Sequence, residues 1–222
     1  MNSILLFGAI ILAFPCVVMA GKFFGKYGLI AWVAIATVLA NIMVTKQVDM
    51  LGMSVTLGNV FFSSTFLATD ILSERCGLKV AKRAVQIGLL SALIFIVATQ
   101  YSLLFQPNIY DTVNDSMKTL FAISARTTTV SVIMFYLSNL ADVYVYDWLK
   151  KKLPKAVWVR NNVATILCNG TENFLFITMA FYGIYTLKEC VMIGLTTTVV
   201  EVIIAICDTP FVYWGIRAYR ER

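Results

Sequence analysis

Apolar residues occur along this chain in long runs, and the short segments between the runs carry most of the charged residues. A helix needs about 17–25 mainly apolar residues to cross the hydrocarbon core of a bilayer. Runs of that kind predict transmembrane helices over 3–20, 28–45, 54–73, 84–105, 121–149, 161–183 and 190–214. The fifth run is long for one crossing, so we expect it to tilt or to extend into the interface. The pattern predicts an all-α integral membrane protein, a bundle of about seven transmembrane helices.

The composition supports this interpretation. Of the 222 residues, 59% are hydrophobic and only 14% are charged, and the mean hydropathy is +0.81. A soluble domain has a charged fraction of about 25%. Because no long polar segment or Ser/Gly-rich linker interrupts the chain, we expect one polytopic membrane domain over residues 1–222.

The basic residues lie in alternate loops, and this pattern predicts the topology. Lys and Arg favour short cytoplasmic loops near the membrane. The basic loops contain Lys22, Lys26, Arg75, Lys79, Lys82, Arg83, Lys150, Lys151, Lys152, Lys155, Arg160, Arg217, Arg220 and Arg222. The other loops hold Lys46, Lys118 and Lys188. This alternation predicts an N-terminus outside and a cytoplasmic C-terminus. It also accounts for the net charge of +6 without a nucleic-acid partner.

The first apolar run has an alternative interpretation as a cleaved signal peptide, with Val18, Met19 and Ala20 at the cleavage site. The first three residues carry no Lys or Arg, and the basic residues follow the run instead of preceding it. We therefore favour a retained helix. Its loss would leave six helices and the same cytoplasmic C-terminus.

The chain has few of the residues that enzymes and metal sites usually use. The chain has no histidine, and none of its cysteines forms a CxxC pair; they are Cys16, Cys76, Cys168, Cys190 and Cys207. Zinc sites, haem ligation and Cys/His or Ser/His catalysis therefore lack their ligands or bases. We expect no enzyme activity, no cofactor and no metal. The seventh run has no lysine that could hold retinal as a Schiff base.

Charged residues inside the apolar runs are the main functional signal. They are Asp70, Arg126, Asp142, Glu172, Glu201 and Asp208. Each costs roughly 2.5–3.5 kcal/mol at a helix centre, so such residues face a partner or a wet cavity and mark substrate or ion paths. One arginine, Arg126, cannot neutralise five carboxylates. We expect some buried ion pairs and a central acidic cavity that opens to the cytoplasm in at least one state.

Depth and helical spacing group these residues. At about 1.5 Å per residue, Glu172 and Glu201 fall near the midplane, the three aspartates toward the cytoplasm, and Arg126 in the outer third. Phe66, Asp70 and Glu74 share one helix face, as do Asn139 with Asp142, Asn169 with Glu172, and Glu201 with Asp208. Arg126 and Asp142 lie on nearly opposite faces, so we do not expect them to line one stripe.

From about Asn41 onward, the chain resembles the queuosine precursor transporter family, also known as the putative vitamin uptake transporter family. The resemblance rests on segment 66–74 (FLATDILSE), on Gly77 with 81–83 (AKR), on Ala125 and Arg126, on the Asp142 segment, and on 208–211 (DTPF). It implies a six-helix protein of the bacterial inner membrane that imports preQ0, preQ1, queuine or queuosine for tRNA modification. It also implies a transporter core over 28–222 and an additional N-terminal helix over 1–27.

The resemblance suggests roles for the polar residues. A 7-deazaguanine presents N1–H and an exocyclic amine as adjacent donors, which one carboxylate can accept bidentately; we assign this role to Glu172. Glu201 or Asp70 would bind the protonated amine of preQ1 or queuine. Asn41, Asn139 and Asn169 could bond the ring edge, and Phe62 and Phe66 could stack on the ring or simply pack. Structural or coupling roles are assigned to Arg126, Asp142, Glu74 and Asp208.

Two departures from the family pattern leave the substrate open. The chain has Glu172 and Asn173 where members often have Asp-Thr, and Glu201 aligns with a position that commonly carries Lys. We predict an importer of a 7-deazaguanine that works by alternating access, with queuine or preQ1 favoured by the acidic cavity. The alternative is a substrate-binding membrane subunit of a multi-component vitamin importer. The oligomeric state stays open, a homodimer included.

Overall fold

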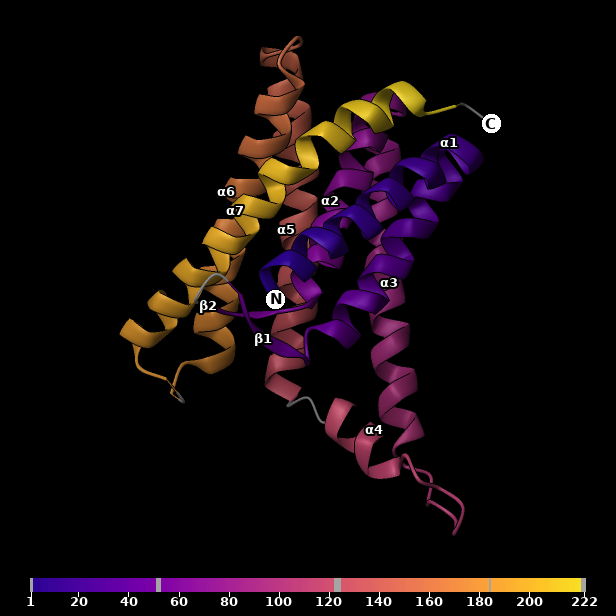
Figure 1. Cartoon of the computed structure of the whole chain (residues 1–222), viewed down its shortest axis with the longest axis vertical. Helices are drawn as coiled ribbons and strands as arrows, with labels where there is room; N and C mark the ends of the chain where they lie inside the picture. The colour runs from indigo at the N-terminus through magenta and orange to yellow at the C-terminus, as the bar shows by residue number, and fades with distance from the viewer. Residues whose placement is uncertain (1, 51–52, 122–124, 184, 221–222) are drawn as a thin grey trace.

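The computed structural model describes residues 2–50, 53–121, 125–183 and 185–220. These residues form an elongated helical bundle with one small hairpin (Figure 1). The elements are α1 (Asn2–Met43), β1 (Gln47–Met50), β2 (Met53–Thr56), α2 (Gly58–Arg75), α3 (Leu78–Ser102), α4 (Asn114–Phe121), α5 (Ala125–Lys152), α6 (Val157–Phe181) and α7 (Leu187–Ala218).

Helix α1 contains both of the first two predicted spans, because a sharp kink at Gly25 folds it back on itself. Gly25 has φ 61° and ψ −142°, a conformation that side chains with a Cβ rarely adopt. The two arms are in close contact, since a Cβ on Gly28 would overlap the carbonyl oxygen of Ala20. The glycines at 25 and 28 therefore permit a tight helical hairpin.

The predicted start of the third helix at residue 54 is wrong. Met53–Thr56 instead forms strand β2, which pairs antiparallel with β1 in a register that places Gln47 opposite Thr56. Helix α2 begins only at Gly58. The hydropathy of the run 54–73 could not separate the strand from the helix, because the strand residues are as apolar as the end of a helix. The fold is therefore helical with a short hairpin added.

The remaining boundaries differ from the prediction by a few residues. Helix α3 begins at Leu78 and not at residue 84. The fifth run corresponds to α5, which begins at Ala125 and continues to Lys152, and the short α4 comes just before it. Helix α6 begins at Val157, so Arg160 lies in its first turn and not in a loop. Helix α7 continues through Pro210 to Ala218.

Helix α2 lies at the centre of the bundle. It contacts α1, α3, α5, α6 and α7, and its residues from Ser63 to Ser73 are all buried. Val60, Leu67, Ala68, Ile71 and Leu72 form its share of the main apolar core, together with residues of α1 and α7. By length and hydropathy, Ile4–Met43, Leu78–Ser102, Thr129–Lys152 and Leu187–Ala218 could cross a membrane. Helices α2 and α6 are more polar and do not reach the hydropathy of a membrane span. Helix α2 can be polar within the membrane because other helices surround it.

The basic segments lie toward one end of the bundle. In Figure 1 the α1 kink, the α5–α6 connection and the end of α7 lie toward the top, and the N-terminus, the hairpin and α4 lie below them. This arrangement agrees with the alternation of basic and non-basic loops along the chain.

Candidate binding site

Three aspartates from three helices meet in the core of the bundle. Asp70 of α2, Asp142 of α5 and Asp208 of α7 are each fully buried. The charges of Asp142 and Asp208 both act on Asp70, so the three carboxyl groups lie within electrostatic reach of one another. We call these three residues the inner cluster.

Helix α6 supplies hydrogen bonds to two members of the inner cluster. Asn161 Nδ2 donates to Asp208 Oδ1 at 2.5 Å, and Thr165 Oγ1 donates to Asp142 Oδ1 at 3.3 Å. Neither oxygen of Asp70 has a hydrogen-bond partner among the described residues, and the second oxygens of Asp142 and Asp208 also lack one. A buried acceptor without a partner costs about 1–3 kcal/mol, and a charged one costs more. The inner cluster can therefore accept several hydrogen bonds from a solute or water.

Asn139 joins α5 to α2 beside the inner cluster. It is fully buried, its Nδ2 donates to the carbonyl oxygen of Phe135 at 3.0 Å, and its Oδ1 accepts from Thr65 Oγ1 at 3.1 Å. Asn139 thus already has two protein partners. Asn41, another candidate, donates to the carbonyl oxygen of Thr37 in its own helix at 2.8 Å.

The two candidate aromatic residues pack against each other. The ring centroids of Phe62 and Phe66 lie 5.1 Å apart in an edge-to-face arrangement, and Phe62 also contacts Phe135 at 5.8 Å. Phe66 is fully buried, whereas Phe62 is half-buried. Of the two rings, Phe62 is therefore the better placed to meet a solute.

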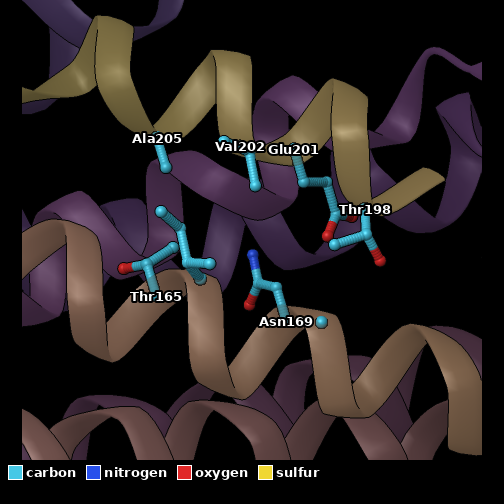
Figure 2. A pocket seen from close by; sticks show the side chains of 8 residues that line it. Thr165, Asn169, Thr198, Glu201, Val202 and Ala205 are labelled. Atoms are coloured by element: carbon cyan, nitrogen blue, oxygen red, sulfur yellow. The ribbon is translucent and has the colours of Figure 1, made fainter. Parts of the chain in front are cut away.

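A narrow crevice separates α6 from α7 near the inner cluster (Figure 2). Its empty space is about 150 Å³, part of which is open to the surroundings, and it is too narrow to admit a water molecule. Its walls are Thr165, Ile166, Asn169 and Gly170 from α6, and Thr198, Glu201, Val202 and Ala205 from α7. Asn169 is 1% exposed, its side chain points toward α7, and neither amide atom has a hydrogen-bond partner in the described part of the chain.

Glu201 and Glu172 form a second acidic group. Glu201 is 4% exposed, and its Oε2 accepts from Asn173 Nδ2 at 2.7 Å. Glu172 is half-buried, and its charge acts on Glu201. Glu172 follows Thr165 by seven residues, which places it on the same side of α6 and about 10 Å further along the helix axis. The carboxylates thus fall into two groups.

The central acidic cavity, expected to open to the cytoplasm in at least one state, stays a prediction, since the hollow that the described residues form is narrow. The space next to these carboxylates is the narrow α6–α7 crevice.

An ion network lies next to the inner cluster and includes residues that sequence reasoning does not find. Glu74 pairs with the buried Arg160 and, at 3.1 Å, with Lys150, and it accepts a hydrogen bond from Tyr146 Oη at 3.1 Å. Arg160 Nη1 also donates to the carbonyl oxygens of Leu153 and Pro154, both at 2.8 Å. The pattern predicts a loop position for Arg160 because it stands just before an apolar run. The polar residue Asn161, with which that run begins, is the feature of the sequence that could have indicated that the helix starts earlier, among polar residues.

Arg126, the expected donor for a buried ion pair, lies in the first turn of α5, where its side chain is outside the described residues. The buried cation that the structure does describe is Arg160, which is 1% exposed.

Buried carboxylates and amides that lack partners among the described residues, inside an apolar helical bundle, are typical of substrate or ion paths in membrane proteins. The family model described as putative vitamin uptake transporter matches residues 56–215, and the chain belongs to this family. It is a transporter and not an enzyme, and in bacteria such a protein lies in the cytoplasmic membrane. The matched region contains the inner cluster, the crevice and the ion network.

Two curated relatives are similar over most of their length. The chain is 35% identical over 214 residues to the probable queuosine precursor transporter of Bacillus subtilis (strain 168). The matched region covers 96% of this chain and 93% of the relative. It is 24% identical over 161 residues to the queuosine precursor transporter of Escherichia coli (strain K12). This matched region covers 71% of each chain. No solved structure matches the chain.

Proposed function

We propose that this protein imports a queuosine precursor, a 7-deazaguanine such as queuine, preQ1 or preQ0, for use in tRNA modification. The names of the two relatives support this substrate class. The observation that carries the proposal within the molecule is Asp70, whose two oxygens are fully buried and without a partner among the described residues.

The donor pattern of the ring fits such a carboxylate. A 7-deazaguanine presents N1–H and the exocyclic amine side by side, and a carboxylate accepts both at once. Asp70 has both oxygens available for this role, and the half-buried Glu172 is the other candidate. Asn169 could then bond the carbonyl edge of the ring, since both atoms of its amide are available.

The charge balance favours a substrate that carries an amine. Glu74 already engages the two nearby cations, Arg160 and Lys150. The inner cluster therefore lacks a cation in direct contact among the described residues, and a buried carboxylate without one must bind a proton or a positive ligand. The protonated amine of queuine or preQ1 would supply that charge. The nitrile of preQ0 would not.

The proposed topology has seven transmembrane helices with the N-terminus outside. The basic end of the bundle then faces the cytoplasm, and the Glu74 network closes that side. Transport requires the network to open after the outer side has closed, as in alternating access. A carboxyl group of the inner cluster could carry a coupled proton.

The proposal is tested in a bacterium that cannot make queuosine. Cells that express the protein receive preQ0, preQ1 or queuine, and the measurement is queuosine-modified tRNA. We expect restoration by an amine-bearing precursor, and its loss in Asp70→Asn and Glu172→Gln variants that still insert into the membrane. Asp115→Asn is the control, because the Asp115 side chain is 97% exposed. Failure of every precursor would contradict the proposal, and full activity of both variants would contradict the site.

Liposomes that contain only the purified chain separate a transporter from a binding subunit. Accumulation of labelled precursor inside the liposomes supports autonomous transport. Binding without accumulation would instead support a substrate-binding subunit of a multi-component importer.

A further inference from the structure

We infer that the crevice between α6 and α7 is the passage through which substrate reaches the inner cluster, and that Glu201 forms an earlier, separate binding subsite at its outer end. The inference rests on the proposed function and adds a route and a second subsite to it. The outer subsite consists of Glu172, Asn173 and Glu201.

The two acidic groups are separated along the bundle axis. Glu201 precedes Asp208 by seven residues on α7, which corresponds to two turns and about 10 Å. Glu172 and Thr165 have the same spacing on α6. Glu201 is influenced by the charge of Glu172, whereas Asp70 is influenced by Asp142 and Asp208. A small planar solute with one amine therefore occupies one group at a time.

The crevice joins these two groups by a row of polar side chains. Thr198 and Glu201 line one part of it, and Thr165, which donates to Asp142, lines another. Asn169 lies between them in sequence and in Figure 2, with its amide aimed across the crevice toward α7. Its two amide atoms, unpartnered among the described residues, offer a donor and an acceptor midway along the route.

The crevice must widen for a solute to pass, because at present it does not admit water. The walls between the polar residues are small or apolar side chains, namely Gly170, Val202 and Ala205. These three residues contribute no side-chain hydrogen bonds, so the hydrogen bonds that must yield near the crevice are those of Asn173 to Thr198 and Glu201. At the outer end, a ligand amine would replace Asn173 as the donor to Glu201. The fitting ligand is a flat, polar ring with a cationic substituent.

A disulfide across the crevice tests the passage. A Cβ added at Gly170 would lie 3.5 Å from Cγ2 of Thr198, the side-chain atom whose place a cysteine sulfur at 198 can take, so two cysteines here would meet across the crevice. The Gly170→Cys/Thr198→Cys variant should import precursor when reduced and fall to the level of cells without the protein when oxidised. Reductant should restore uptake. Each single variant serves as a control for pairing with the native cysteines.

A plug provides a second test that needs no cross-link. Val202→Trp should fill the crevice and abolish uptake, whereas Val199→Trp should leave it intact, because Val199 is 48% exposed on the outer face of the same helix. Uptake by the Val202→Trp variant equal to that of the Val199→Trp variant would overturn the passage, as would normal uptake by fully cross-linked protein.

The outer subsite has its own kinetic readout. Glu201→Gln should raise the precursor concentration needed for half-maximal uptake and leave the maximal rate largely unchanged, whereas Asp70→Asn should lower the maximal rate. An unchanged half-maximal concentration in Glu201→Gln would overturn the outer subsite. If the unmodified protein imports no precursor in the same assay, the proposed function fails and not merely the passage.

Discussion

Arg160 at the start of α6 and Glu74 at the end of α2 form a buried ion pair. The guanidinium of Arg160 also lies over the ring of Tyr146, with 5.6 Å between the Cζ atom and the ring centroid. Tyr146 and Lys150 of α5 bond to the same Glu74. The Glu74 carboxylate therefore connects α2, α5 and α6, and these helices also hold or hydrogen-bond members of the inner cluster. Asp70 lies one turn from Glu74 on α2, and Arg160 acts on its charge.

Removal of the Glu74 charge should destabilise the protein strongly. Glu74→Gln leaves Arg160 buried without its anion, and breaking a buried pair in this way costs about 3–5 kcal/mol. We expect a clear fall in the unfolding temperature of the protein in detergent. Asp147→Asn is the matched control, because its partner Lys151 is 73% exposed and such surface pairs contribute about 0–1 kcal/mol. Equal effects of the two variants would show that the Glu74 pair has no special role.

A methyl group at Gly28 should disrupt the hairpin of α1. The added Cβ would overlap the carbonyl oxygen of Ala20, which belongs to the backbone and cannot rotate away. We expect Gly28→Ala to reduce the amount of folded protein recovered from membranes. Gly8→Ala should behave like the parent, since no atom lies within 4 Å of its added Cβ. Normal yields of Gly28→Ala would mean that the arms of α1 can separate at little cost.

Asn161 should be needed to hold Asp208. Asn161→Ala removes the donor to Asp208 Oδ1 and leaves that buried oxygen unpaired, at a cost of about 1–3 kcal/mol. We expect both thermal stability and precursor uptake to decrease. Asn162→Ala provides the comparison on the same helix, because Asn162 bonds Trp158 and Thr209 at the edge of the interface. The assignment fails if Asn162→Ala is the more damaging change.

Phe62 should contribute to substrate affinity if its ring meets the substrate. Phe62→Leu keeps an apolar side chain but removes the ring, and loss of one aromatic stacking contact is worth about 0.5–1.5 kcal/mol. We expect weaker precursor binding, measured with labelled ligand in detergent. Phe95→Leu is the control, since Phe95 packs on Phe121 at 5.9 Å near α4. Unchanged binding by Phe62→Leu would leave only a packing role for this ring.

The proposed orientation can be checked with an impermeant thiol reagent on intact cells. A cysteine at Asp111, in the exposed loop between α3 and α4, should react from outside. A cysteine at Lys155, in the exposed α5–α6 connection, should react only after the cells are opened. The reverse pattern would invert the topology, and the parent protein measures labelling of the native cysteines.

Much of the membrane architecture follows from local properties of the sequence. The length of an apolar run and the cost of a charge within it depend on neighbouring residues alone, so the approximate helices and the burial of Asp70, Asp142, Glu201 and Asp208 could be predicted. The hairpin at β1 and β2 could not, because an apolar strand and the end of an apolar helix have the same hydropathy.

The tertiary structure alone decided which polar groups meet. Arg160 bonds Glu74 across 86 positions, and Asn161 bonds Asp208 across 47, so neither partner could be read from spacing along one helix. Depth along the chain already places Glu172 and Glu201 near the midplane and the three aspartates toward the cytoplasm. Helix packing then decides that the members of each group, which come from different helices, face one another. The sequence by itself determined that charges are buried in a membrane bundle. Their partners depended on how the helices rotate and pack against α2, a property of the whole chain.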